Sequence, residues 1–179
     1  MQGFWCDYDK AWYYSHMNLL SRKYELFLRN LVFGVEDGIV STVGLLSGIA
    51  IANVPRATIF LTGVILIFVE AISMAAGSFL AEESVSDHTE RESDVEHSLF
   101  GGVIMFFSYF VAGFIPLFPY IVMDVGPAFY WSIILSFIAL FALGYWSGRK
   151  RKPVQKALRM MLVGGAAIII GVTAGSILS

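Results

Sequence analysis

Four side chains with metal-binding or proton-binding chemistry lie inside apolar stretches of this sequence. Glu36 and Asp37 are adjacent within residues 31–48, and Glu70 lies in a second apolar stretch, four residues before Met74. Placing an ionised acid in the middle of a membrane costs about 2.5–3.5 kcal/mol on insertion scales, so such acids usually serve a function. The first interpretation is therefore an ion or proton pathway. The alternative for residues 36 and 37 is that they reach interfacial water near the start of a helix.

The spacing of Glu70 and Met74 places them on one face of a helix. A carboxylate beside a thioether combines a hard and a soft ligand, which suits a borderline divalent transition ion better than Mg²⁺ or Ca²⁺. A methionine on an apolar helix usually serves packing, so Met74 gains meaning only from its neighbour. The pair predicts a site for a borderline divalent transition ion, while helix packing and proton uptake stay open as other roles of Glu70.

A second group of potential ligands lies in the acidic segment 81–98, AEESVSDHTERESDVEHS. Read as a helical continuation of the preceding apolar stretch, it places five side chains on one stripe, at spacings of 4, 3, 4 and 3 residues: Glu83, Asp87, Glu90, Asp94 and His97. Carboxylates with an imidazole suit Fe²⁺, Mn²⁺ or Zn²⁺. Because like charges four residues apart repel each other, the stripe is either a surface that attracts metal ions or a hydrated acidic connector.

Five apolar segments must position these groups. The chain is 57% hydrophobic and 15% charged, with a mean hydropathy of +0.71, which indicates a polytopic membrane protein. Helices are expected because backbone groups in lipid must be hydrogen-bonded internally, and a span needs about 20 residues. The predicted spans are 31–53, 57–80, 99–121, 127–147 and 157–178. We therefore expect an all-α membrane protein with a five-helix transmembrane domain at 31–179, preceded by an interfacial aromatic and amphipathic segment at 1–30.

The basic residues predict the orientation of these spans. With a cytoplasmic N-terminus, segments 1–30, 81–98 and 148–156 all face the cytoplasm, and Arg56 is the only basic loop residue on the far side. The positive-inside rule then places the C-terminus on the far side. Because an odd number of spans leaves no inverted repeat in one chain, a pseudo-symmetric pore needs two copies.

Glycines spaced four residues apart recur in the apolar segments and predict close packing between helices. The pairs are Gly34 and Gly38, Gly44 and Gly48, Gly144 and Gly148, and Gly171 and Gly175. Small residues at this spacing allow two helix backbones to approach each other, either within one chain or between two copies.

The stretches FGVEDGIVSTVGLLSG and AISMAAGSFLAEES resemble the first two helices of the vacuolar iron transporter family. That family carries an aspartate in a DG[LI]V[ST] setting and an SM-x-x-G turn, while the last three spans here match mainly by size and by the basic loop before the last. The resemblance implies a homodimer that exports Fe²⁺, with Mn²⁺ as a second candidate, from the cytosol in exchange for protons through a pore between the subunits. It assigns Asp37 and Met74 to that pore. Glu36 stands where many members have Asn, and segment 81–98 stands where longer members have a glutamate-rich metal-binding domain.

The resulting hypothesis is that the acidic stripe draws Fe²⁺ from the cytosol and that Asp37 and Met74 hold it in the pore. Glu36 and Glu70 then act as further ligands or proton carriers. Two alternatives stay open: a membrane-anchored metal sensor or buffer acting through 81–98 without transport, and a proton-coupled carrier of an organic cation. The host membrane would be the plasma membrane of a prokaryote, or a vacuolar or other organelle membrane of a eukaryote.

An enzyme is not expected, because the sequence contains no nucleophile and base pairing, phosphate-binding loop or dinucleotide fingerprint. No prosthetic group and no nucleic-acid partner are expected either. The expected partners are a second copy of the chain, metal ions, protons and the lipid bilayer.

Overall fold

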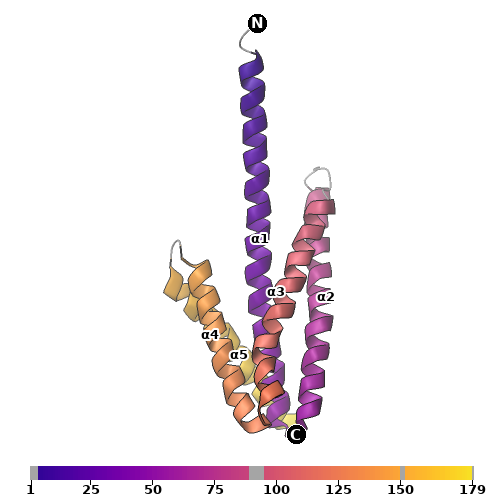
Figure 1. Cartoon of the computed structure of the whole chain (residues 1–179), viewed down its shortest axis with the longest axis vertical. Coiled ribbons are helices and arrows are strands. Elements are labelled where there is room, and N and C mark those ends of the chain that lie inside the picture. Colours follow the sequence, from indigo (N-terminus) through magenta and orange to yellow (C-terminus); the bar gives the residue numbers. More distant parts are fainter. Residues whose placement is uncertain (1–3, 89–94, 150–151, 179) are drawn as a thin grey trace.

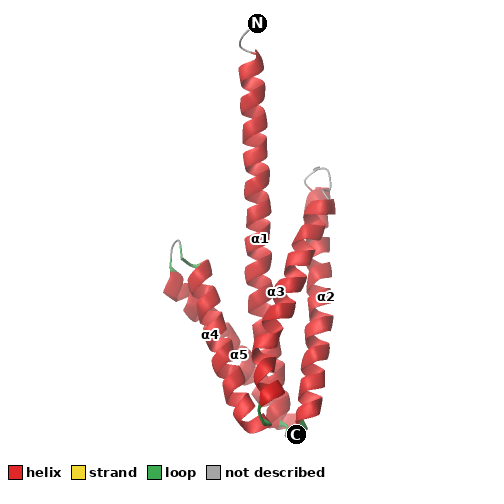
Figure 2. Ribbon diagram, in the orientation of Figure 1, coloured by secondary structure: helices red, strands yellow, loops and turns green. Residues whose placement is uncertain are grey.

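The computed structural model describes residues 4–88, 95–149 and 152–178 and, within the first two helices, the side chains of residues 23–85. These described residues form five helices and no strand (Figure 2). The helices are α1 (Phe4–Ile51), α2 (Arg56–His88), α3 (Val95–Val122), α4 (Val125–Ser147) and α5 (Pro153–Leu178). Each contains a stretch that is long and apolar enough to cross a membrane. The prediction of an all-α chain with five membrane-spanning helices is confirmed.

The helices run alternately up and down, so the two termini lie at opposite ends of the bundle (Figure 1). The end of α2, the start of α3, the end of α4 and the start of α5 lie toward the end from which the N-terminus extends, whereas the connections between α1 and α2 and between α3 and α4 lie at the other end. Assigning the first of these ends to the cytoplasm stays a prediction from the basic residues.

Helix α1 is a single helix of 48 residues, which at 1.5 Å per residue is about 72 Å long. A bilayer core is about 30 Å thick, so one span uses only part of this length. The N-terminal part projects beyond the other helices (Figure 1). No break marks the expected boundary at residue 30, because residues 4–33 contain neither proline nor glycine to end the helix. The interfacial role of segment 1–30 stays a prediction.

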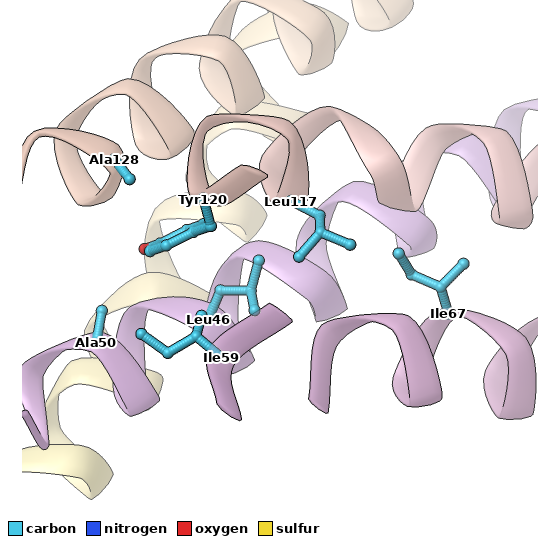
Figure 3. Packing of buried hydrophobic residues seen from close by; sticks show 7 residues of the cluster. All are labelled: Leu46, Ala50, Ile59, Ile67, Leu117, Tyr120 and Ala128. Atoms are coloured by element: carbon cyan, nitrogen blue, oxygen red, sulfur yellow. The ribbon is translucent and has the colours of Figure 1, made fainter. Parts of the chain in front are cut away.

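The core forms around α1, which contacts all four other helices. One cluster of buried apolar side chains joins α1 to α2, α3 and α4: Leu46, Ala50, Ile59, Ile67, Leu117, Tyr120 and Ala128 (Figure 3). A second cluster joins α1 to α3, α4 and α5: Ile39, Ala112, Leu140 and Met160. The far faces of the outer helices expose large apolar side chains, as expected for surfaces in contact with lipid.

The glycine pairs are located where helix backbones approach each other. Gly38 of α1 lies against α3, and a Cβ added there would be 2.6 Å from the carbonyl oxygen of Tyr109. Gly48 lies against α5, and its added Cβ would be 2.6 Å from the carbonyl oxygen of Gly171. The prediction of close glycine packing is confirmed, and these contacts lie within one chain.

Side chains of one helix donate hydrogen bonds to backbone carbonyl groups of a neighbouring helix. At the start of α2, the Arg56 guanidinium donates from Nε to the carbonyl oxygen of Tyr120, at 2.8 Å, and from Nη2 to that of Ile121. The last carbonyls of a helix have no partner inside it, so Arg56 satisfies two such groups at the end of α3. In the middle of the bundle, Ser132 of α4 donates to the carbonyl oxygen of Pro116, at 2.7 Å.

Replacing Gly48 with alanine should push α1 away from α5, because the new methyl group would overlap the backbone of Gly171. We expect a destabilisation of about 1–3 kcal/mol, the usual cost of overpacking, measured as a lower melting temperature of the protein in detergent. The control is Gly126→Ala, where an added Cβ meets nothing within 4 Å. Equal melting of the two variants would contradict this account of α1–α5 packing.

Candidate functional site

Asp37 of α1 and Glu70 of α2 lie close to each other beside Tyr109 of α3. The two carboxylates interact electrostatically, and both interact with the Tyr109 hydroxyl. The Tyr109 side chain is completely buried, whereas both acids are half-buried. Three helices thus bring together residues that are far apart in the sequence.

A chain of two hydrogen bonds fixes the turn of α1 that carries Asp37. Ser41 Oγ donates to the backbone carbonyl of Asp37, at 2.7 Å, and lies 2.6 Å from the hydroxyl of Tyr109. Because a serine hydroxyl has only one hydrogen, Tyr109 is the donor in the second bond. The ring of α3 is therefore tied to the helix turn that positions the carboxylate.

Tyr109 is a site residue that the sequence analysis missed. The sequence does contain a sign of its role, because Tyr109 lies in the middle of an apolar span. Tyrosine is more common in the aromatic belts at the two membrane interfaces. A buried tyrosine hydroxyl usually requires a hydrogen-bond partner. Which partner it would find could not be read from the sequence, since Ser41 and Tyr109 are 68 residues apart.

Glu70 and Met74 share one face of α2, as their spacing predicted, and both are half-buried. Gly77 continues this face, and a Cβ added there would meet nothing within 4 Å. The neighbouring Ser73 and Ala76 are small and exposed. In this single chain, the strip of α2 that carries the carboxylate and the thioether is therefore open along one side.

Glu36 lies on a different side of α1 from Asp37. It lines two adjoining cavities of about 660 and 640 Å³ between α1, α4 and α5. Lys156 of α5 attracts its carboxylate electrostatically. A helix turns by about 100° per residue, so adjacent side chains meet different neighbours. The role of Glu36 as a ligand or proton carrier beside Asp37 stays a prediction.

The acidic connector does not form the predicted single stripe. Helix α2 continues as far as residue 88, so Glu83 and Asp87 lie on its helical extension as expected. Glu90 and Asp94 lie outside the described residues. His97 lies on α3, which begins at Val95 and runs antiparallel to α2 (Figure 1). The prediction of five ligands on one continuous helix is therefore wrong for His97, while metal binding by these residues is still a prediction.

His97 instead lies in a group of polar side chains that joins three helices. Arg29 Nη2 of α1 donates to Glu82 Oε2 of α2 at 2.7 Å. His97 Nε2 of α3 lies 3.8 Å from Glu82 Oε1. The Glu82 side chain is only 15% exposed, and the Arg29 side chain is 63% exposed. This contact holds the ends of α1, α2 and α3 together next to the acidic connector.

Among the residues that the structure describes, no three His, Cys, Asp or Glu side chains group closely enough to hold a metal ion. The predicted pore residues Asp37, Glu70 and Met74 lie on neighbouring helices, two of them carboxylates and one a thioether. Chemically, such a set can bind a borderline divalent cation through oxygen and sulfur.

Known proteins that resemble this chain are named as iron transporters. Vacuolar iron transporter 1 of Tulipa gesneriana is 24% identical over 203 aligned positions, which cover 78% of this chain and 82% of the relative. Vacuolar iron transporter 1 of Arabidopsis thaliana is 23% identical over 206 positions, with coverage of 78% and 81%. Vacuolar iron transporter 2 of Oryza sativa subsp. japonica is 37% identical over 65 positions, or 36% of this chain and 26% of the relative.

The alignment with the tulip protein is longer than the part of this chain that it covers, 203 positions against 78% of 179 residues, so the relative carries inserted residues. The VIT family model matches this chain in two parts, residues 28–101 and 97–176. The division falls at the start of α3, next to the acidic connector. Together the two parts extend from the middle of α1 almost to the end of α5, and the chain therefore belongs to the VIT family.

Proposed function

We propose that this protein transports Fe²⁺ across a membrane, with Mn²⁺ as a second candidate ion. The observation that carries the proposal is the meeting of Asp37 and Glu70 beside Met74, inside the spans of a VIT-family chain. Oxygen and thioether donors together suit a borderline transition ion. The relatives named above as vacuolar iron transporters support iron as the ion.

The pore lies between two copies of the chain. The open strip of α2 carries Glu70, Met74 and Gly77, and small exposed residues beside it allow close approach of another helix. A two-fold axis along this strip would place the same residues of both copies around one path. The ligand set would then consist of two aspartates, two glutamates and two methionines, and each chain would supply one of each.

The ion leaves the cytosol in exchange for protons. A carboxylate must be deprotonated to bind a metal ion, so Fe²⁺ and protons compete for Asp37 and Glu70. A proton gradient directed toward the cytosol can therefore displace the ion on the far side. With the N-terminus in the cytoplasm, the acidic connector lies at the entrance. The membrane is that of a vacuole or other organelle in a eukaryote, and the plasma membrane in a prokaryote.

The connector collects cations at this entrance. Glu83 and Asp87 extend α2 beyond the apolar part of its span, and a concentration of negative charge raises the local concentration of cations. Glu82 is engaged by Arg29 and His97, and we assign it to holding the helices rather than to the ion. In this arrangement Glu36 is set apart from the pore by its position facing α5.

Replacing Asp37 with asparagine should remove the charge at the centre of the site while keeping the size of the side chain. We expect the initial rate of Fe²⁺ uptake into proteoliposomes with an imposed pH gradient to fall by about tenfold or more, which corresponds to about 1.4 kcal/mol of activation free energy. Asp124→Asn is the control, because Asp124 is an exposed acid in the turn between α3 and α4. Undiminished uptake by Asp37→Asn would overturn the assignment.

Replacing Met74 with leucine should test the thioether separately from packing, because the two side chains have similar volumes. We expect weaker Fe²⁺ binding by calorimetry and an unchanged melting temperature, since an apolar side chain of the same size still fits. Leu61→Met, nine residues before Glu70 and so on the opposite side of the same helix, where the native side chain is 58% exposed, is the reciprocal control and should bind Fe²⁺ as the parent does. Full Fe²⁺ affinity in Met74→Leu would remove sulfur from the proposed ligand set.

A cysteine at position 77 should crosslink two copies if α2 lies at the interface. The native chain has a single cysteine, Cys6, so the experiment uses Cys6→Ser with Gly77→Cys and an oxidant in membranes. We expect a disulfide-linked dimer on a denaturing gel. The matched control is Leu162→Cys on the outer face of α5, where the native side chain is 73% exposed. A dimer from Leu162→Cys alone would place the interface elsewhere.

A further inference from the structure

The two cavities that Glu36 lines adjoin each other near the end of α4 and the start of α5, and together they are called the recess. Glu36, Ser147, Lys156 and Met160 line both cavities. Five basic side chains line one or both of them: Arg29, Arg149, Lys152, Lys156 and Arg159. Glu36 is the only acid among the described lining residues. The recess is therefore strongly positive, which is opposite in charge to the proposed metal pathway.

Three of these cations are available to bind an anion. Glu36 attracts Lys156, and Arg29 is bonded to Glu82. Arg149, Lys152 and Arg159 are exposed, and none of the three forms a salt bridge with another residue that the structure describes. Placing three like charges around one recess favours a ligand with concentrated negative charge, such as a phosphate group.

Many of the other lining residues are apolar, and some of them are exposed on the outside of the bundle. Phe33 of α1 is 50% exposed and Val163 of α5 is 51% exposed. Trp146 and Tyr24 also line the recess, and these two residue types gather at the level of lipid headgroups. The cations lie near the helix ends, whereas Val163 lies deeper along α5. The recess thus has a charged upper part and an apolar lower part, open toward the surface that lipid covers.

We propose that this recess binds an anionic glycerophospholipid. The phosphate group lies between Lys152 and Arg159, and an acyl chain follows the apolar wall formed by Phe33 and Val163. Lys156 stands between the headgroup and Glu36, so a bound lipid is linked to the turn of α1 that precedes Asp37. Basic recesses between membrane helices are known to accept anionic headgroups. A free phosphate would use the same cations but would leave the apolar wall unused.

The test uses the delipidated full-length protein in detergent and follows its melting temperature as ligand is added. Phosphatidylglycerol should raise the melting temperature, whereas phosphatidylcholine and inorganic phosphate at equal concentrations should not. In the double variant Lys152→Gln with Arg159→Gln, we expect the apparent affinity for phosphatidylglycerol to fall by about tenfold or more, because two cations near the headgroup are lost. The control is Lys23→Gln, an exposed cation of α1 that does not line the recess.

Two further variants separate lipid binding from folding. Lys152→Arg with Arg159→Lys keeps both charges and should retain the response to phosphatidylglycerol. Phe33→Gln, on the apolar wall, should weaken the lipid response without changing the charge. Stabilisation by inorganic phosphate alone would assign the recess to a free anion and overturn the proposal. An equal response to phosphatidylcholine, or an unchanged response in Lys152→Gln with Arg159→Gln, would also overturn it.

Discussion

The close approach of α1 to its neighbours is the constraint on which the rest of the structure depends. Gly38 allows the backbone of α3 to lie against α1 at Tyr109, and Gly48 allows α5 to lie against it at Gly171. A side chain at either position would move the helices apart. Because Gly38 directly follows Asp37, the same contact that packs α1 on α3 also brings the carboxylate beside the Tyr109 ring.

The central position of α1 gives its two adjacent carboxylates different surroundings. Asp37 meets Glu70 and Tyr109, while Glu36 meets Lys156 and the recess beside α5. The first set gathers negative charge, and the second set gathers positive charge. Helix α1 therefore borders a group of acidic side chains on one side and a group of basic side chains on the other.

Polar contacts at the ends of the helices complement the apolar core. Arg29 and Glu82 join α1 to α2 at one end, and Arg56 joins α2 to the last carbonyls of α3 at the other. Lipid tails are as apolar as leucine, so helix association inside a membrane rests on packing and hydrogen bonds more than on the hydrophobic effect. The side chains that reach across the ends therefore add polar contacts to helices that are held together mainly by packing.

The sequence by itself determined the number and type of the spans, the glycine contacts and the face shared by Glu70 and Met74. These properties depend on local composition and on the helical period, which are readable along the chain. Tertiary structure decided which helices meet. It placed Tyr109 beside Asp37, turned Glu36 toward α5, and moved His97 from the predicted stripe onto α3. The physical reason is that contacts between side chains of different helices depend on how each helix is rotated about its own axis and on where one helix ends and the next begins. Residue spacing alone determines neither.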